Sequence, residues 1–453
     1  MTTVILAAGQ GTRMRSALPK VLQPLAGKPL LGHVLDLVAA IDCSDTVVVY
    51  GHGGKAVQAA FPAETLKWAE QAEQLGTGHA VKMAMPHIDD GRLVLVLCGD
   101  VPLLRPATLQ ALLSTCANGD VGVLTVDIDD PTGYGRIVRD TSGFVQAIVE
   151  QKDASPDELT VREINSGVIC APSAKLRQWL DALSTDNAQG EYYLTDVISA
   201  AANDGTTVHA VKADDPDEVM GINDRRQLAA AECIYQHRLA NELMDSGVSL
   251  ADPARIDIRG SLRSGQDTFI DVNCVFEGDV VLGERVHIGP GAVIKNTTIG
   301  DDTVIHPHCV MEDSAIGARC QIGPFARLRP GAEFAAGSKA GNFVEVKKSH
   351  IGEGSKVNHL TYIGDATVGR DVNVGAGTIT CNYDGANKHH TTIGDEAFIG
   401  SGVNLVAPIT VGAGATVGAG STISRDAPDG ELTLNRAPQK TITGWQRPVK
   451  KKR

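Results

Sequence analysis

Aromatic residues are scarce in this chain of 453 residues, where Phe, Tyr and Trp together make up 4%. Positive charge is also in short supply, because 41 Lys and Arg stand against 54 Asp and Glu and leave a net charge of −13. A nucleic-acid-binding protein carries a basic surface, so this balance argues against that class. The net negative charge does not exclude a local basic pocket on the surface.

Three sequence patterns are missing as well. No CxxC pair occurs among the nine cysteines, which argues against a zinc site and favours reduced thiols over a disulfide framework. No apolar run reaches the ~18 residues of a membrane span. The first residues enter a strand pattern without the charged and apolar regions of a signal peptide. We therefore expect a cytoplasmic protein.

The chain changes character near residue 250. Before that point, short apolar segments alternate with helical patterns, which is typical of an α/β domain with a Rossmann-like, mostly parallel sheet. The expected strands are Val4–Ala8, Thr46–Tyr50, Leu93–Leu97 and Val121–Val126, and helical patterns cover Leu30–Ala40 and Ala107–Cys116.

A long helical pattern then runs from Glu218 to Ser246, and Gly247 directly after it is a stop signal. We expect this helix to join two domains. The predicted organisation is a first domain at 1–224, a linking helix at 225–247 and a second domain at 248–453. The apolar stripe of the helix consists of Leu228, Ala231, Tyr235, Leu239 and Leu243.

Beyond this helix, aliphatic residues recur every six positions. Steps of five, six and six residues combine into a recurring 17-residue unit. Such hexapeptide repeats indicate a parallel β-helix, in which three short strands form one triangular coil and the recurring side chain points inward. The positions are Ile270, Phe276, Leu282, Ile288, Ile294, Ile299, Ile305, Met311, Ile316, Ile322 and Leu328, then Ile351, Val357, Ile363, Val368 and Val374, and finally Ile393, Ile399, Leu405, Val411, Val417 and Ile423.

Two segments interrupt this repeat, at about 335–350 and 381–392. An insertion in a solenoid forms a loop outside the stack, and loops on a rigid scaffold often carry function. We therefore expect functional loops at both places. Resemblance to hexapeptide-repeat proteins implies a left-handed winding, which the spacing alone does not establish.

A glycine-rich turn follows the first predicted strand in VILAAGQGTRMRSALPK, Val4–Lys20. Met14 stands where a dinucleotide fingerprint needs its third glycine, and no Gly-Lys-Ser/Thr is present to make a P-loop. The backbone N–H groups of the turn can still face phosphates, with Arg13 and Lys20 as cations. Taken alone, the stretch is equally compatible with an ordinary strand and turn.

Further motifs give this stretch a context. Leu6–Met14 with Pro19 and Lys20 resembles the signature of sugar-phosphate nucleotidyltransferases. Together with Asn187–Asp196 and the hexapeptide half, the resemblance extends over essentially the whole chain to the bacterial bifunctional N-acetylglucosamine-1-phosphate uridyltransferase/glucosamine-1-phosphate acetyltransferase family. The other matching segments are Gln71–His79, Gly99–Leu103, Gly133–Arg136, Glu150, Asn165–Gly167 and Gly221–Asn223.

This resemblance implies a two-step synthesis of UDP-N-acetylglucosamine, a precursor for peptidoglycan and lipopolysaccharide. The second domain would transfer acetyl from acetyl-CoA to glucosamine-1-phosphate. The first domain would then transfer uridylyl from UTP to N-acetylglucosamine-1-phosphate and release pyrophosphate.

The uridylyl site joins two anionic reactants, so it must neutralise charge and align groups. By resemblance, Asp100 and Asn223 would hold Mg²⁺, and Arg13 and Lys20 would be the catalytic cations. Cys98 departs from the family, in which Tyr or another polar residue is frequent at this position. The implied UTP and UDP-sugar contacts are Leu6, Ala7, Ala8, Gly9, Lys20, Gln71, Gly76, Thr77, Gly135, Glu150, Asn165 and Asn223.

The acetyl site needs a base, because an ammonium has no lone pair with which to attack a thioester, and histidine suits that role near neutral pH. His359 matches the catalytic position of the family. The resemblance also implies a coenzyme groove between neighbouring chains of a homotrimer. The sugar-phosphate contacts would be Arg329, Lys347, Tyr362, Asn373 and Lys388, and the acetyl-CoA contacts Ala376, Asn382, Tyr383, Ser401, Ala419 and Arg436.

Two other functions stay open at this point. The chain could be a sugar nucleotidyltransferase with one activity, whose β-helix serves only assembly or allostery; His359 beside the Asn382–Tyr383 motif argues against that. It could also be a regulatory subunit with a degraded site, against which the intact Lys20, Asp100 and Asn223 argue.

Overall fold

The computed structural model describes residues 1–43, 45–62, 65–116 and 118–450. The chain divides into two compact units, Met1–Tyr235 and Gln236–Arg453. The division falls inside helix α7 (Arg225–Asp245), which lies where the linking helix is predicted. The helix begins later than the Glu218–Ser246 pattern, because Pro216–Val219 forms a separate 3-10 turn. The domain limits at 224 and 247 stay predictions, and the limit at 453 lies outside the described residues.

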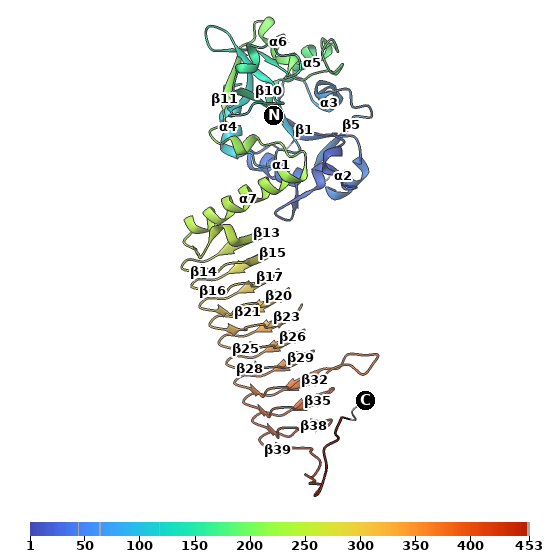
Figure 1. Ribbon diagram of the computed structural model, residues 1–453, viewed down its shortest axis with the longest axis vertical. Coiled ribbons are helices and arrows are strands. Elements are labelled where there is room, and N and C mark those ends of the chain that lie inside the picture. The colour runs from blue at the N-terminus through green and yellow to red at the C-terminus, as the bar shows by residue number, and fades with distance from the viewer. Residues whose placement is uncertain (44, 63–64, 117, 451–453) are drawn as a thin grey trace. The chain divides into compact units, whose positions relative to one another are not determined.

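A mostly parallel sheet forms the centre of the first unit, as predicted (Figure 1). Its strand order is β11-β7-β10-β6-β1-β4-β5, and β10 alone in this order runs antiparallel to its neighbours. A hairpin of β8 (Arg136–Arg139) and β9 (Val145–Val149) pairs with β10. The strands are β1 (Thr2–Ala7), β4 (Thr46–Tyr50), β5 (Leu66–Glu70), β6 (Leu93–Cys98), β7 (Val121–Asp127), β10 (Glu163–Pro172) and β11 (Val208–Lys212).

Helices cover both faces of this sheet. Along β1, Val4 belongs to one buried cluster and Ile5 to the other, because successive side chains of a strand point to opposite faces. One cluster packs against α3 (Thr77–Ala84), α5 (Ser173–Asp181) and α6 (Asp196–Asn203), and the other against α1 (Leu30–Ala40), α2 (Gly54–Ala60) and α4 (Pro106–Thr115).

The second unit is a parallel β-helix with three faces, which confirms the predicted fold class (Figure 1). Strands β13 (Ile256–Ser264) and β15 (Cys274–Leu282) run across faces 2 and 3 in the first coils. Face 1 consists of β12 (Ser249–Leu250), β14 (Phe269–Ile270), β16 (His287–Ile288), β19 (Val304–Ile305), β22 (Gln321–Ile322), β25 (Lys339–Asn342), β28 (Lys356–His359), β31 (Asn373–Val374), β34 (Phe398–Ile399), β37 (Thr416–Val417) and β39 (Leu432–Thr433).

Faces 2 and 3 belong to one 17-stranded sheet that bends between them. Face 2 consists of β17 (Val293–Lys295), β20 (Val310–Glu312), β23 (Arg327–Leu328), β26 (Glu345–Lys347), β29 (Tyr362–Gly364), β32 (Ile379–Cys381), β35 (Asn404–Val406) and β38 (Thr422–Ile423). Face 3 consists of β18 (Thr298–Ile299), β21 (Ala315–Ile316), β24 (Ala332–Phe334), β27 (Ser349–Ile351), β30 (Ala366–Val368), β33 (Thr391–Ile393) and β36 (Ile409–Val411).

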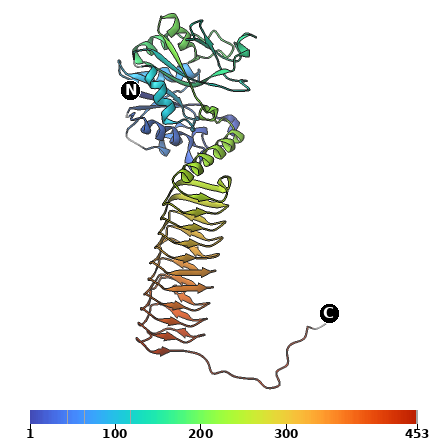
Figure 2. The same ribbon diagram turned by 90° about the vertical axis from the view of Figure 1, so that its left-hand side faces the viewer.

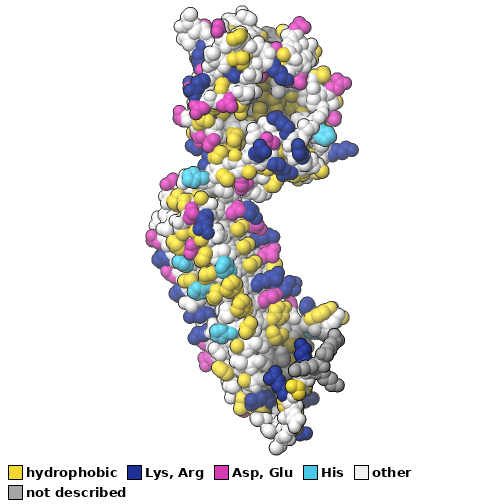
Figure 3. Space-filling view, in the orientation of Figure 1, with side chains coloured by type: hydrophobic (Ala, Val, Ile, Leu, Met, Phe, Trp, Pro, Cys, Tyr) yellow, Lys and Arg dark blue, Asp and Glu magenta, His cyan; other side chains and the backbone are white. Residues whose placement is uncertain are grey.

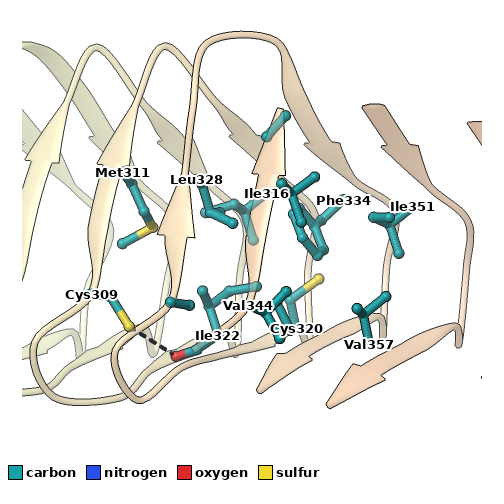
Figure 4. Packing of buried hydrophobic residues seen from close by; sticks show 14 of the residues in the cluster. Cys309, Met311, Ile316, Cys320, Ile322, Leu328, Phe334, Val344, Ile351 and Val357 are labelled. Carbon is teal, nitrogen blue, oxygen red and sulfur yellow. Dashed lines mark hydrogen bonds between the residues drawn. The ribbon is translucent and has the colours of Figure 1, made fainter. Parts of the chain in front are cut away.

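The recurring hexapeptide residues fill the interior of the coils (Figure 4). All of them are buried, from Ile270 to Ile423. Because each coil covers the next, aliphatic side chains of similar size suffice to make a continuous core, and the chain needs few aromatic residues.

The predicted loop at 335–350 is wrong. Phe334, Ala340 and Val346 pair with Ile316, Ile322 and Leu328 of the preceding coil, so the ladder continues without a break. This coil holds one extra residue, which shifts the spacing, and the small Ala340 hides the repeat in the sequence. The loop predicted at 381–392 is present, because β32 ends at Cys381 and β33 begins at Thr391 (Figure 1).

After β39, the chain leaves the coils as an extended segment (Figure 2). Its apolar residues Ile442 and Trp445 are exposed. Among the residues that the structure describes, no helix is long and apolar enough to cross a membrane.

Candidate functional sites

A cleft of about 300 Å³ opens at the carboxyl ends of β1 and β6, where ligands of α/β sheets usually bind. It brings together nine residues predicted for the uridylyl site: Leu6, Ala7, Ala8, Gly9, Lys20, Gln71, Gly76, Thr77 and Asp100. Val21, Gln74, Ala80, Cys98 and Glu191 complete its lining.

The glycines of the first turn have separate roles. Gly11 has a φ of +60°, and a Cβ there would lie 2.7 Å from the Lys20 Cβ, so glycine permits both the turn and the approach of Lys20. A Cβ on Gly9 would meet no atom within 4 Å. Gly9 therefore leaves open space in the cleft, which a phosphate can enter.

Three polar side chains meet deeper in the site. Lys20 forms an ion pair with Asp100, and its Nζ donates a hydrogen bond to Asn223 Oδ1 at 3.1 Å. The backbone N–H of Ile222 donates to the Asp100 carbonyl at 2.9 Å, which ties the two loops together. Two side-chain oxygens thus converge on one cation.

This donor set fits Mg²⁺, which binds through one or two protein oxygens and completes its shell with phosphates and water. Asp100 and Asn223 supply those oxygens, and the Lys20 ammonium shows that a cation is accommodated between them. In the described part of the chain, no group of three or more His, Cys, Asp or Glu could hold a metal. A metal here would therefore depend on ligands from the substrate.

The predicted base-recognition segment is held by α3 and the 187–196 segment. Gln71 is buried, and its Nε2 donates to the Gly76 carbonyl at 3.0 Å. Gly76 has a φ of +113°, and a Cβ there would lie 2.5 Å from the Tyr192 carbonyl oxygen. Thr77 Oγ1 accepts from the Leu194 N–H at 3.1 Å, so the motif that extends the family resemblance braces this side of the cleft.

Gly135, Glu150 and Asn165 form a cluster of their own outside the lining of the cleft. The Asn165 N–H donates to the Gly135 carbonyl at 2.9 Å, and Thr195 Oγ1 donates to Glu150 Oε1 at 3.2 Å. Burial raises the pKa of Glu150, and the negative charge of Asp196 adds to the effect. Thr195 follows Leu194, so this cluster adjoins the Thr77 side of the cleft.

Arg13 is another predicted residue that the structure does not bring to the lining of the cleft. It lies on an exposed 3-10 turn, Thr12–Met14, and is not among the residues that line the cleft. The turn is anchored by the buried Met14.

The second group of predicted residues lies along the corner between faces 1 and 2, which we call the His359 corner. Asn342, His359, Ala376, Ser401 and Ala419 occupy equivalent positions in successive coils. The residue after each has a positive φ, and its N–H bonds the carbonyl of the coil before: Leu360 to Asn342, Gly377 to His359, Gly402 to Ala376 and Gly420 to Ser401.

His359 is oriented by Asn342, a residue that the sequence prediction missed. His359 Nδ1 lies 2.9 Å from Asn342 Oδ1. An amide oxygen only accepts hydrogen bonds, so in the neutral imidazole Nδ1 carries the proton and Nε2 keeps its lone pair. Asn342 precedes His359 by one 17-residue coil and pairs with it in the ladder, so the repeat length was the signal that could have found it.

The predicted sugar-phosphate residues lie on two faces. Arg329, Lys347 and Tyr362 are on the strands of face 2 or directly after them, whereas Asn373 is on face 1, across the His359 corner. Lys388 lies in the 381–392 loop, with its Nζ 4.2 Å from the centre of the Tyr383 ring. Among the described residues, no hydrogen bond or ion pair links Asn373 or Lys388 to the other three.

The predicted coenzyme residues follow the corner toward the C-terminus. Ala376, Ser401 and Ala419 stack there. A Cβ on Gly418 would lie 3.7 Å from the Arg436 guanidinium, which places Arg436 beside the last of these coils. Asn382 hydrogen-bonds Asp365 at the base of the loop, and Tyr383 is exposed within the loop.

Comparison with known proteins covers both units. Residues 3–195 match the MobA-like NTP transferase domain, residues 258–335 the GMPPB C-terminal domain, and residues 390–425 six repeats of the bacterial transferase hexapeptide. A solved structure of UDP-glucose pyrophosphorylase complexed with UDP-glucose covers 52% of this chain and 98% of its own, with 16% identity and a TM-score of 0.45.

Two relatives match along the full chain. The bifunctional protein GlmU of Burkholderia multivorans is 56% identical over 452 residues, and that of Azoarcus sp. 55% identical over 452 residues; both alignments cover 100% of each chain. The chain therefore belongs to the family of the bifunctional protein GlmU, with an NTP transferase domain followed by a hexapeptide-repeat transferase domain.

Proposed function

We propose that this chain makes UDP-N-acetylglucosamine in two steps. The β-helix transfers acetyl from acetyl-CoA to glucosamine-1-phosphate, and the first unit couples the product to UMP from UTP, releasing pyrophosphate. The observation that carries this proposal is the family match over the whole length, which includes both a nucleotidyltransferase unit and a hexapeptide unit.

In the uridylyl step, a sugar-phosphate oxygen attacks the α-phosphorus of UTP. Gly9 leaves room for the phosphates, and Lys20 supplies positive charge where negative charge accumulates. Asp100 and Asn223 would hold Mg²⁺, which neutralises phosphate charge when bound. Gln71 and Thr77, held by backbone contacts, would face the uracil edge.

In the acetyl step, His359 removes a proton from the sugar ammonium so that the amine can attack the thioester carbon. The bond to Asn342 leaves Nε2 as the basic atom. Lys347 provides positive charge on face 2 for the sugar phosphate, and Arg329, which pairs with Glu345 at 2.9 Å, would add to it by turning to the phosphate. Ala376, Ser401 and Ala419 have small side chains, which would let acetyl-CoA lie close to the backbone along the corner.

We also propose that the acetyl site is completed in a homotrimer. Lys347 lies on face 2 and Asn373 on face 1, across the His359 corner, and this placement favours a substrate site between two chains. An exposed apolar ladder supports this: His308, Phe325 and Phe343 stack along the corner with ring centres 5.2 and 5.4 Å apart. Figure 3 shows hydrophobic and histidine side chains gathered on the middle coils. Such a patch is typical of an association surface.

The proposed setting is the bacterial cytoplasm, together with the small-molecule partners UTP, N-acetylglucosamine-1-phosphate, glucosamine-1-phosphate and acetyl-CoA.

One assay tests both steps. The protein is mixed with glucosamine-1-phosphate, acetyl-CoA, UTP and Mg²⁺, and CoA thiol and pyrophosphate are followed together. Asp100→Ala is expected to abolish pyrophosphate release and spare thiol release. His359→Ala is expected to lose thiol release and still use supplied N-acetylglucosamine-1-phosphate. If either variant lost both activities while folded, the two-site assignment would be wrong.

A further inference from the structure

The exposed segment between Arg13 and Lys20 is held in place by a buried glutamine. Gln23 is 2% exposed, and its Nε2 donates to Ser16 Oγ at 3.1 Å and to the Leu18 carbonyl at 3.0 Å. Both donor hydrogens of the amide are thus used on this segment. Leu18 itself is 42% exposed, so packing does little to fix the backbone there.

The first residue of α7 secures the same segment from the other side. Arg225 Nε donates to the Met14 carbonyl at 3.2 Å, and its Nη1 donates to Gln23 Oε1 at 3.0 Å. Arg225 therefore fixes the start of the segment directly and its middle through Gln23. Arg225 and Gln23 are 202 positions apart in the chain.

The same helical turn also positions Asn223. Asp224 caps α7, because its Oδ1 accepts from the N–H groups of Arg226 and Gln227. Gln227 Oε1 accepts from the Asn223 N–H at 2.7 Å. One turn of helix thus holds Asn223 and, through Arg225, the segment that ends at Lys20.

We infer that Arg225 and Gln23 are positioning residues for nucleotidyl transfer: they form a brace that presents the Arg13–Lys20 segment to the triphosphate of the nucleotide. Neither residue lines the cleft, so they act through the segment they hold. Cations that are fixed before the nucleotide binds lose less conformational entropy on binding, which strengthens phosphate recognition. This inference rests on the proposed uridylyl transfer.

The kinetic test compares Arg225→Met with Arg225→Lys and a matched control, Arg226→Met. Arg226 is the next residue on α7 and is exposed. Its backbone N–H, not its side chain, donates to Asp224 Oδ1, so the substitution leaves this hydrogen bond in place. Arg225→Met removes two hydrogen bonds that act on the nucleotide only through the segment. It is therefore expected to raise KM for UTP about three- to tenfold, an effect of about one direct hydrogen bond, with partial rescue by lysine. Acetyl transfer by the same chains should be unchanged, which shows that the loss is confined to the first unit.

A second test needs no activity. Trypsin cleaves after Arg13 and Arg15, inside the segment, so limited proteolysis with mass spectrometry measures how well the segment is held. Arg225→Met and Gln23→Leu should both be nicked there faster than wild type and Arg226→Met. Because this measurement does not depend on activity, the cleavage rates would still test the brace if the protein showed no uridylyl transfer. Wild-type nicking together with wild-type KM in both Arg225→Met and Gln23→Leu would overturn the inference.

Discussion

Replacement of Asn342 by leucine tests the proposed role of His359 as the base of acetyl transfer. The side-chain oxygen of Asn342 lies 2.9 Å from His359 Nδ1, and leucine keeps a similar size without an acceptor. Without the bond, the imidazole can rotate and carry its proton on Nε2. That nitrogen then has no lone pair with which to accept the proton of the sugar ammonium.

The magnitude follows from one exposed hydrogen bond, worth about 1 kcal/mol net. Because about 1.4 kcal/mol corresponds to a tenfold change in rate, kcat for acetyl transfer should fall about fivefold. This is much less than the ~10²–10⁴-fold contribution expected of a general base, so the variant should be clearly more active than His359→Ala.

The assay is thiol release from acetyl-CoA over pH, with pyrophosphate release from the same protein as the folding control. A second variant, Asn342→Asp, keeps the acceptor but adds negative charge, which favours the charged imidazolium. Its activity should require higher pH than wild type. Wild-type rates for Asn342→Leu and an unmoved pH profile for Asn342→Asp would refute the role given to this residue.

Three further predictions concern the first unit. Burial raises the pKa of Glu150, so the ionised carboxylate is unfavourable in the fold; Glu150→Gln should raise Tm at neutral pH, and the gain should vanish as pH falls below the carboxyl's unfolded pKa. Thermal unfolding across pH measures this difference; if a partner stabilised the carboxylate, Glu150→Gln would instead lower Tm at neutral pH. Gly11→Ala meets both the φ of +60° and the Lys20 Cβ, so it should lower kcat/KM for pyrophosphate release at least about tenfold while sparing acetyl transfer. Removal of divalent metal with EDTA should stop pyrophosphate release and leave thiol release unchanged; equal loss of both would contradict separate sites.

The sequence predicts the β-helix well, because each inward position repeats under the same packing constraint. It fails between 335 and 350 for a physical reason: Ala340 fills an inward position that a larger aliphatic residue usually marks, and one extra residue shifts the spacing. The strand ladder tolerates the extra residue at a corner of the coil, because an insertion there changes no strand pairing.

The contacts of the two sites also differ in how far the sequence predicts them. The predicted residues that line the cleft at β1 and β6 lie at strand ends and in turns, so local motifs locate them. Gln23 and Arg225 meet only through tertiary folding, and neither belongs to a recognisable motif. Asn342 lies between these cases, since a single coil separates it from His359 and the 17-residue period alone predicts the contact.

The placement of Lys347 and Asn373 on different faces leads to a complementation experiment that tests the proposed homotrimer. If each acetyl site lies between face 2 of one chain and face 1 of its neighbour, Lys347→Ala and Asn373→Ala damage different halves of each site. In a cyclic trimer, every mixed assembly then contains one interface with both wild-type residues. Random mixing after joint refolding should restore about a quarter of the wild-type thiol-release rate. If instead one chain provided both residues, every site would stay damaged and the mixture would be no more active than the separate variants.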